Sequence, residues 1–108
     1  MESSNLFDLI DSSPKGVSKK ELVDDRDLGV KLLNLATNQS LPPHATPATA
    51  LFYVLSGEGI IQVENEERAL GPGTLVKTDP KVKHGIRNTG TQTLSILLVQ
   101  GPNPFFCC

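Results

Sequence analysis

The sequence has no tryptophan, one tyrosine, two histidines and two cysteines among its 108 residues. The cysteines, Cys107 and Cys108, are adjacent at the C-terminus. A bond between neighbouring cysteines is strained and links no distant segments, which excludes a disulfide framework. We interpret them as two reduced thiols on a terminal tail. The alternative is a soft metal or redox site that residues from elsewhere in the chain complete.

The chain also lacks long apolar runs and a large excess of either charge. No run approaches the roughly 20 apolar residues that a membrane-spanning helix needs. The first seven residues lack the basic and then apolar stretches of a signal peptide. A formal net charge of -2 gives no electrostatic reason to expect nucleic acid or an anionic membrane as partner. These absences predict a cytoplasmic protein with neither kind of partner.

Short β-prone runs alternate with turn-forming residues from Asp27 onward, which is typical of an antiparallel sandwich or barrel. Glycine accepts positive φ, proline fixes φ, and Asn or Asp side chains close backbone turns. We expect strands over 30–36, 50–56, 60–64, 74–78, 84–88 and 93–100. We expect turns at 42–43, 57–59, 65–66, 71–73, 79–80 and 88–90, with 64–68 as a solvated hairpin tip. The fold class is therefore predicted to be all-β.

Two of the expected strands, 50–56 and 93–100, are apolar on both faces. Strands of this kind are covered on both sides, and a second copy of the chain is the simplest cover for the outer face. We therefore expect a homodimer. Nearer the N-terminus, 5–14 fits either an extended arm or a short helical turn, and 18–27 contains a possible strand.

Two segments carry a family resemblance: LPPHATP followed by LFYVLSGEG, within 41–59, and GPGTLVKTDPKVKHGIRN at 71–88. They resemble the two motifs of the cupin superfamily, and the chain is similar to its small single-domain members over about 30–102. The resemblance implies a single antiparallel double-stranded β-helix, the cupin or jelly-roll barrel. We expect an N-terminal arm and first edge strand over 1–26, the barrel over 27–104 and a C-terminal tail over 105–108.

The resemblance also places metal-ligand positions, and the chain departs from half of them. His44 and His84 match two of the four ligands of the family, whereas Thr46 stands at the second histidine and Ala50 at the glutamate. A divalent metal is generally held by three or four ligands, commonly imidazoles with a carboxylate. A divalent Zn, Fe, Mn, Ni or Cu ion would therefore need a substitute ligand. Candidate substitutes are Glu58, Gln62, Asn34 and a thiolate of Cys107 or Cys108.

Without a metal, two inward-facing histidines still make a binding site, because a neutral imidazole both donates and accepts hydrogen bonds. If Ala50 faces inward as its family counterpart does, strand alternation turns Phe52 and Val54 inward and Tyr53 outward. An outward tyrosine disfavours acid–base catalysis. The predicted ligand-binding residues are His44, Thr46, Phe52, Val54 and His84. The predicted metal ligands are His44 and His84. In the first of the three functions considered next, these two residues hold no metal.

Three functions remain open. In the first, the barrel binds a small polar molecule without catalysis and without a tightly held metal. In the second, the protein is a metal-dependent enzyme of small organic substrates, such as a dioxygenase, isomerase or decarboxylase. In the third, the pocket has lost its role and the protein is structural or mediates interactions. Outside the pocket, Asn88 is expected to close a turn and Arg87 to face away from His84.

Overall fold

The computed structural model describes residues 1–106 of the chain. These residues form nine β-strands and one 3-10 helix. They are η1 (Leu6–Leu9), β1 (Val17–Asp24), β2 (Gly29–Leu35), β3 (Ser40–His44), β4 (Thr49–Ser56), β5 (Gly59–Val63), β6 (Glu66–Leu70), β7 (Leu75–Thr78), β8 (His84–Asn88) and β9 (Leu94–Gly101). All strand pairs are antiparallel. The prediction of an all-β antiparallel barrel is confirmed. The interpretation of Cys107 and Cys108 falls outside the described residues.

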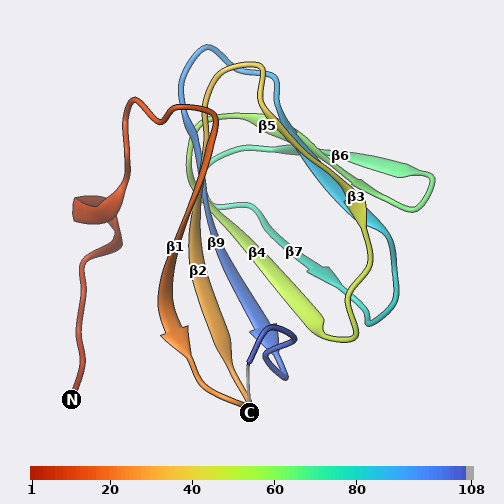
Figure 1. Ribbon diagram of the computed structural model, residues 1–108. Coiled ribbons are helices and arrows are strands. Elements are labelled where there is room, and N and C mark those ends of the chain that lie inside the picture. Colours follow the sequence, from red (N-terminus) through yellow and green to blue (C-terminus); the bar gives the residue numbers. More distant parts are fainter. Residues whose placement is uncertain (107–108) are drawn as a thin grey trace.

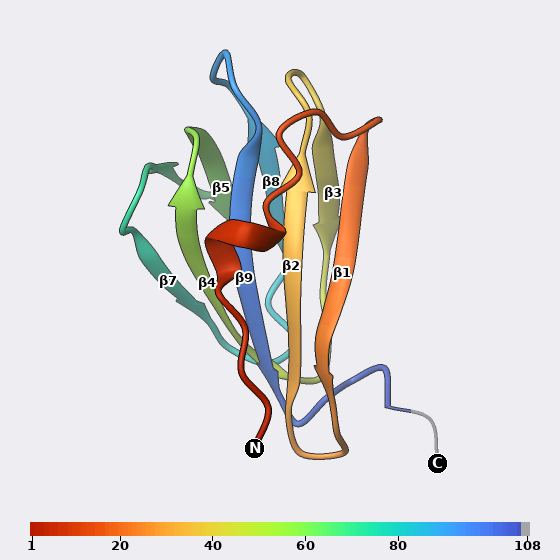
Figure 2. The same ribbon diagram turned by 90° about the vertical axis from the view of Figure 1, so that its left-hand side faces the viewer.

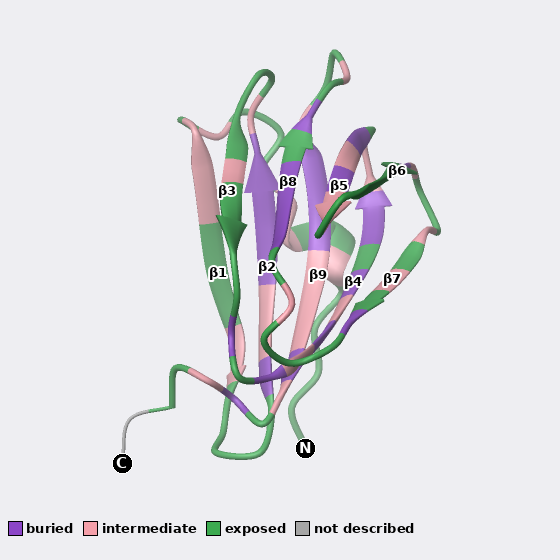
Figure 3. Cartoon of the chain, turned by 90° about the vertical axis from the view of Figure 1, so that its right-hand side faces the viewer, coloured by how far each residue is buried: buried purple, intermediate pink, exposed green. Residues whose placement is uncertain are grey.

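The strands form two sheets that face each other across the core (Figure 1). One sheet has the order β1-β2-β9-β4-β7 and the other the order β3-β8-β5-β6. Buried residues concentrate on the inner strands, whereas β3 and β6, the two edges of the smaller sheet, are largely exposed (Figure 3). An edge strand has one face and one side open to water, and polar or charged residues there discourage pairing with other chains.

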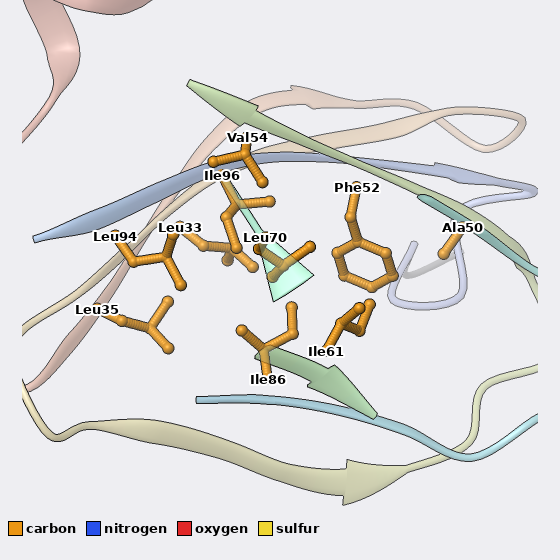
Figure 4. Packing of buried hydrophobic residues seen from close by; sticks show 10 residues of the cluster. All are labelled: Leu33, Leu35, Ala50, Phe52, Val54, Ile61, Leu70, Ile86, Leu94 and Ile96. Carbon is orange, nitrogen blue, oxygen red and sulfur yellow. The ribbon is translucent and has the colours of Figure 1, made fainter. Parts of the chain in front are cut away.

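The core forms where the inward-facing side chains of both sheets meet (Figure 4). Its buried members are Leu33, Leu35, Ala50, Phe52, Val54, Ile61, Leu70, Ile86, Leu94 and Ile96. Burying one such large apolar side chain stabilises a fold by about 1.5–3 kcal/mol. The predicted alternation along β4 is confirmed, because Ala50, Phe52 and Val54 are buried while Tyr53 is 40% exposed.

The prediction of a turn at Pro42 and Pro43 was wrong, because both lie in β3. Proline lacks an amide hydrogen and is excluded from the interior of a sheet, but an edge strand or a bulge tolerates it. Both conditions hold here. β3 is an edge strand, and its register with β8 shifts between Leu41 and His44, so that the two prolines lie opposite the single residue Gly85.

The hairpin tip predicted over 64–68 is shorter than expected. The loop contains only Glu64 and Asn65, since Val63 and Glu66 already pair across β5 and β6. Glu64 has a φ of 52°, and positive φ in a two-residue loop matches the twist of the flanking strands. The charged residues that follow the loop belong to the exposed edge strand β6.

The N-terminal segment contains a short helix and also acts as an arm, so both alternatives for 5–14 describe part of it. η1 lies across the outer face of the larger sheet (Figure 2). The hydroxyl of Thr93 donates a hydrogen bond to the backbone oxygen of Ser12 at 3.1 Å, which fixes the end of the arm. The chain thus covers part of this apolar face itself. No helix within residues 1–106 has the length and apolarity to span a membrane.

The remaining apolar surface of this sheet includes Tyr53 and Leu75, which are paired across β4 and β7 and are both exposed. The homodimer and the division into arm, barrel and tail stay predictions. The interpretations of Asn88 and Arg87 agree with the structure: the Asn88 side chain accepts from the Gly90 amide at 2.9 Å, and Arg87 is exposed.

Gly85 allows β3 to approach β8 closely. A β-carbon at this position would lie 2.9 Å from the backbone nitrogen of Pro43 and 3.0 Å from the backbone oxygen of Leu41. Backbone atoms of a paired strand cannot move aside without breaking the ladder. Only glycine therefore fits opposite the two prolines.

We expect Gly85→Ala to lower the free energy of unfolding by about 1–3 kcal/mol, the usual cost of forcing a methyl group into packed structure. Urea denaturation followed by circular dichroism measures the change. Gly71→Ala is the matched control, because a β-carbon there meets nothing within 4 Å. Equal stability of Gly85→Ala and Gly71→Ala would contradict the close approach of β3 to β8.

Candidate functional site

The two histidines, 40 positions apart in sequence, are direct cross-strand partners at the end of β3 and the start of β8. Their ring centroids are 4.9 Å apart with an interplanar angle of 53°. The ring of Phe52, from the opposite sheet, meets the ring of His84 edge-on at 5.3 Å. The structure therefore brings together three of the residues that the sequence proposed for one site.

A backbone carbonyl orients each imidazole. Nδ1 of His44 lies 3.1 Å from the backbone oxygen of Pro42, and Nδ1 of His84 lies 3.1 Å from that of Val82. A carbonyl oxygen only accepts hydrogen bonds, so Nδ1 of each ring must donate. In a neutral ring this leaves Nε2 without a proton. Both histidines therefore present Nε2 as a hydrogen-bond acceptor or ligand atom.

The two histidines differ in their surroundings. His84 is 4% exposed, whereas His44 is exposed. Burial lowers the pKa of His84 below its ordinary value of 6.5; the Val82 carbonyl partly opposes this by raising the pKa, and the charge of His44 adds to the lowering. His84 is therefore a neutral acceptor near pH 7.

A cavity of about 50 Å³ opens beside the histidines. Its apolar wall includes Leu33, Leu41, Phe52, Ile86 and Leu98, which come from both sheets. Its polar groups are His44, His84, Gln100, Lys19 and Lys31. Apolar walls with a few convergent polar groups are typical of small-molecule sites.

Two predicted ligand-binding residues do not form this wall. Val54 lies two residues beyond Phe52 along β4, which is about 6.6 Å deeper at the usual rise of a strand, and it packs in the fully buried core (Figure 4). Thr46 is buried in the loop before β4, and its hydroxyl has no hydrogen-bond partner within the part of the chain described. Facing inward was therefore not sufficient to place a residue at the cavity.

Sequence reasoning missed the two lysines and Gln100. In β2, Lys31 shares its face with Leu33 and Leu35, and in β9 Gln100 shares its face with Leu98 and Ile96, because successive side chains of a strand alternate. The signal was present in the sequence. A polar residue at the inward position of an otherwise apolar strand marks a place where the core gives way to a pocket.

The segment after β9 holds an aromatic ring at the cavity. The Asn103 side chain donates to Oδ1 of Asp24 at 2.7 Å, and its own oxygen accepts from the amide of Phe105 at 3.1 Å. The Phe105 ring thereby lies 4.1 Å from Nζ of Lys31, a distance that gives a cation–π attraction. Phe105, placed in the tail by sequence reasoning, is part of the cavity wall.

The donor atoms present do not fit a tightly held divalent metal. The two imidazoles have the tautomer that a metal requires, and a carbonyl behind each one is a typical supporting partner. However, the position of the family glutamate is filled by Ala50, and within residues 1–106 no group of three His, Cys, Asp or Glu side chains could hold an ion. Thr46 offers only a neutral hydroxyl.

The candidate substitute ligands in the described chain lie elsewhere. The Asn34 side chain accepts from the Ser95 hydroxyl at 2.7 Å, on the opposite face of β2 from Lys31 and Leu33. Gln62 donates to the backbone oxygen of Glu64 at 3.2 Å. Glu58 is exposed in the turn after β4.

The lowered pKa of His84 predicts a pH dependence of stability. Below pH 6.5 the unfolded chain protonates this histidine before the folded chain does, so the free energy of unfolding falls until the folded pKa is reached. We expect the parent protein to lose more stability than His84→Gln between about pH 7.5 and pH 5.5. Urea denaturation at each pH measures both proteins. A constant difference between them across this range would show that burial does not perturb His84.

Comparison with known proteins identifies the family. The family described as "Cupin domain" matches residues 31–100. No curated protein sequence matches the chain. Among solved structures, TT1209 from Thermus thermophilus is similar with 26% identity and a TM-score of 0.88, covering 94% of this chain and 98% of that one.

Two further structures share the fold. An RmlC-like cupin family protein with a double-stranded β-helix fold from Methanocaldococcus jannaschii is 21% identical, with a TM-score of 0.76 and coverage of 84% of each chain. The DMSP lyase DddQ from Ruegeria pomeroyi is 19% identical, with a TM-score of 0.77, covering 85% of this chain and 50% of that one. With its double-stranded β-helix fold and a family match over most of its length, this chain belongs to the Cupin domain family.

Proposed function

We propose that the protein binds a small polar molecule inside the barrel, without a tightly held metal. The observation that carries the proposal is the His44 and His84 pair, whose Nε2 atoms are both acceptors beside an apolar-walled cavity. At the largely buried His84, an acceptor with little access to water is costly to leave unpaired, whereas the exposed His44 can accept from water. A ligand that donates to these atoms and fills the apolar wall would remove that cost.

The composition of the cavity wall argues against acid–base catalysis by a carboxylate or a tyrosine. Among residues 1–106, those that line the wall include no carboxylate and no tyrosine, and Tyr53 lies on the outer face of β4. General acid–base catalysis needs a proton donor and acceptor within hydrogen-bond reach of the substrate. The imidazoles supply the acceptor, and the cationic donors that the described chain contributes to the wall are Lys19 and Lys31.

The test is ligand binding by metal-free protein. Protein dialysed against EDTA is screened by thermal shift against small organic acids, alcohols, sugars and amides, each with and without added divalent metal. We expect at least one compound to raise the melting temperature equally in both conditions. At a ligand concentration of 100 times Kd, the stabilisation is about 2.7 kcal/mol.

The double variant His44→Ala/His84→Ala should lose this shift, whereas the control Glu58→Ala, exposed in a distant turn, should keep it. Elemental analysis of the same samples after dialysis distinguishes the proposed metal-free binding from the alternative, a metal-dependent enzyme. Retention of one equivalent of metal by the parent, its loss from the double variant and no ligand for the metal-free protein would overturn the proposal in favour of a metal-dependent enzyme.

A further inference from the structure

We infer that the ligand is a short-chain hydroxycarboxylate, with its carboxylate at Lys31 and Lys19 and its hydroxyl at the His44 and His84 pair. This inference rests on the proposed function and names its ligand class. It follows from the opposite hydrogen-bonding characters of the two groups of polar residues in one cavity.

The two lysines form the anion-binding part of the cavity. Lys31 pairs with Glu21 across β1 and β2, and Lys19 pairs with Leu33, so the lysines are diagonal neighbours on the same face. Such neighbours lie about 7–8 Å apart at the backbone, within reach of long side chains. Two ammonium groups can therefore reach the two oxygens of one carboxylate.

Neither ammonium group forms an ion pair within the described chain. Among the ion pairs of residues 1–106, none includes Lys19 or Lys31, although the exposed Glu21 lies opposite Lys31. The contact of Lys31 is instead the Phe105 ring, which attracts the cation without neutralising it. Hydrogen bonds between an ammonium and a carboxylate are roughly twice as strong as those between neutral groups.

The histidines require the other end of the ligand to be a hydrogen-bond donor. Their Nε2 atoms accept, and a carboxylate oxygen also only accepts, so a carboxylate gains nothing there. A hydroxyl group donates to such an atom. Gln100 adds an amide at the cavity that is 3% exposed and takes part in none of the side-chain hydrogen bonds of residues 1–106. Its carbonyl and NH₂ groups can contact the hydroxyl or the carboxylate.

The size of the cavity limits the ligand to a short chain. Its volume of about 50 Å³ is well below the roughly 150 Å³ of a cavity that holds benzene. Only the short carbon chain of the ligand can therefore lie between Leu33, Phe52 and Leu98. Its polar ends then lie at the open side of the cavity, where Lys19 and His44 are exposed. An amino group in place of the hydroxyl would add a cation beside two lysines, which disfavours amino acids.

The experiment compares probes that differ by one group. Isothermal titration calorimetry on EDTA-treated protein measures 2-, 3- and 4-hydroxybutyrate, each against butyrate and against the butanediol that lacks its carboxylate. We expect one hydroxybutyrate to bind about tenfold or more tighter than both of its analogues, because each analogue leaves polar groups of the cavity unpaired. The matching aminobutyrate should bind more weakly than the hydroxybutyrate.

Two variants assign the ends of the ligand. Lys31→Gln should weaken the binding of hydroxybutyrate and of butyrate by about tenfold while leaving the affinity for the diol unchanged. His84→Phe should make hydroxybutyrate and butyrate bind equally, and His84→Gln provides a second variant should the phenylalanine disturb folding. Lys20→Gln is the matched control for Lys31→Gln, since Lys20 lies on the opposite face of β1 from Lys19.

Four results would overturn the inference. Equal affinity of the parent protein for butyrate and hydroxybutyrate would contradict recognition of the hydroxyl group by the histidines. Equal affinity for the diol and hydroxybutyrate would contradict recognition of the carboxylate by the lysines. If no four-carbon probe binds but another small molecule stabilises the metal-free protein through the histidines, the ligand class is wrong and the proposed function stands. If no compound binds the metal-free protein, both fall.

Discussion

The pairing of β3 with β8 controls the geometry of the site, because it places His44 directly opposite His84. This pairing is unusual in containing two consecutive prolines, which lack amide hydrogens and would disrupt an inner strand. The edge position of β3 and the missing side chain of Gly85 make it possible. The carbonyl of Pro42, within the same irregular stretch, then fixes the ring of His44. Backbone geometry and the hydrogen-bonding state of the site therefore depend on the same few residues.

The departures from the family pattern change the charge of the site as well as its ligand number. A carboxylate at the position of Ala50 would offset a bound cation, and without it the charged groups that residues 1–106 bring to the cavity wall are two lysines. A divalent cation next to two ammonium groups is unfavourable, whereas an anion is stabilised. Thr46 and Ala50 thus leave a metal without two of the family's ligands, and the lysines of the wall agree with the anionic ligand that we propose.

The C-terminal segment is part of the site as much as the barrel is. Asn103 joins it to the end of β1 through Asp24, and this contact positions Phe105 beside Lys31. The aromatic ring attracts the ammonium group without forming an ion pair. An exposed lysine would otherwise lose conformational entropy on binding a ligand, and holding it in place beforehand reduces that cost.

Strand periodicity and the turn residues predicted an all-β fold from the sequence alone, because side-chain alternation and turn chemistry are local properties. The resemblance to the two cupin motifs implied the type of barrel and, together with strand alternation, the inward direction of Phe52. Local rules failed at Pro42 and Pro43, since only the position of β3 at a sheet edge makes prolines acceptable in a strand. The tertiary structure alone decided that Lys19, Lys31, Gln100 and Phe105 share a cavity with the histidines, and that Val54 does not. The pattern of each strand indicates which of its side chains face inward, but where a core ends and a cavity begins depends on register between segments far apart in the chain.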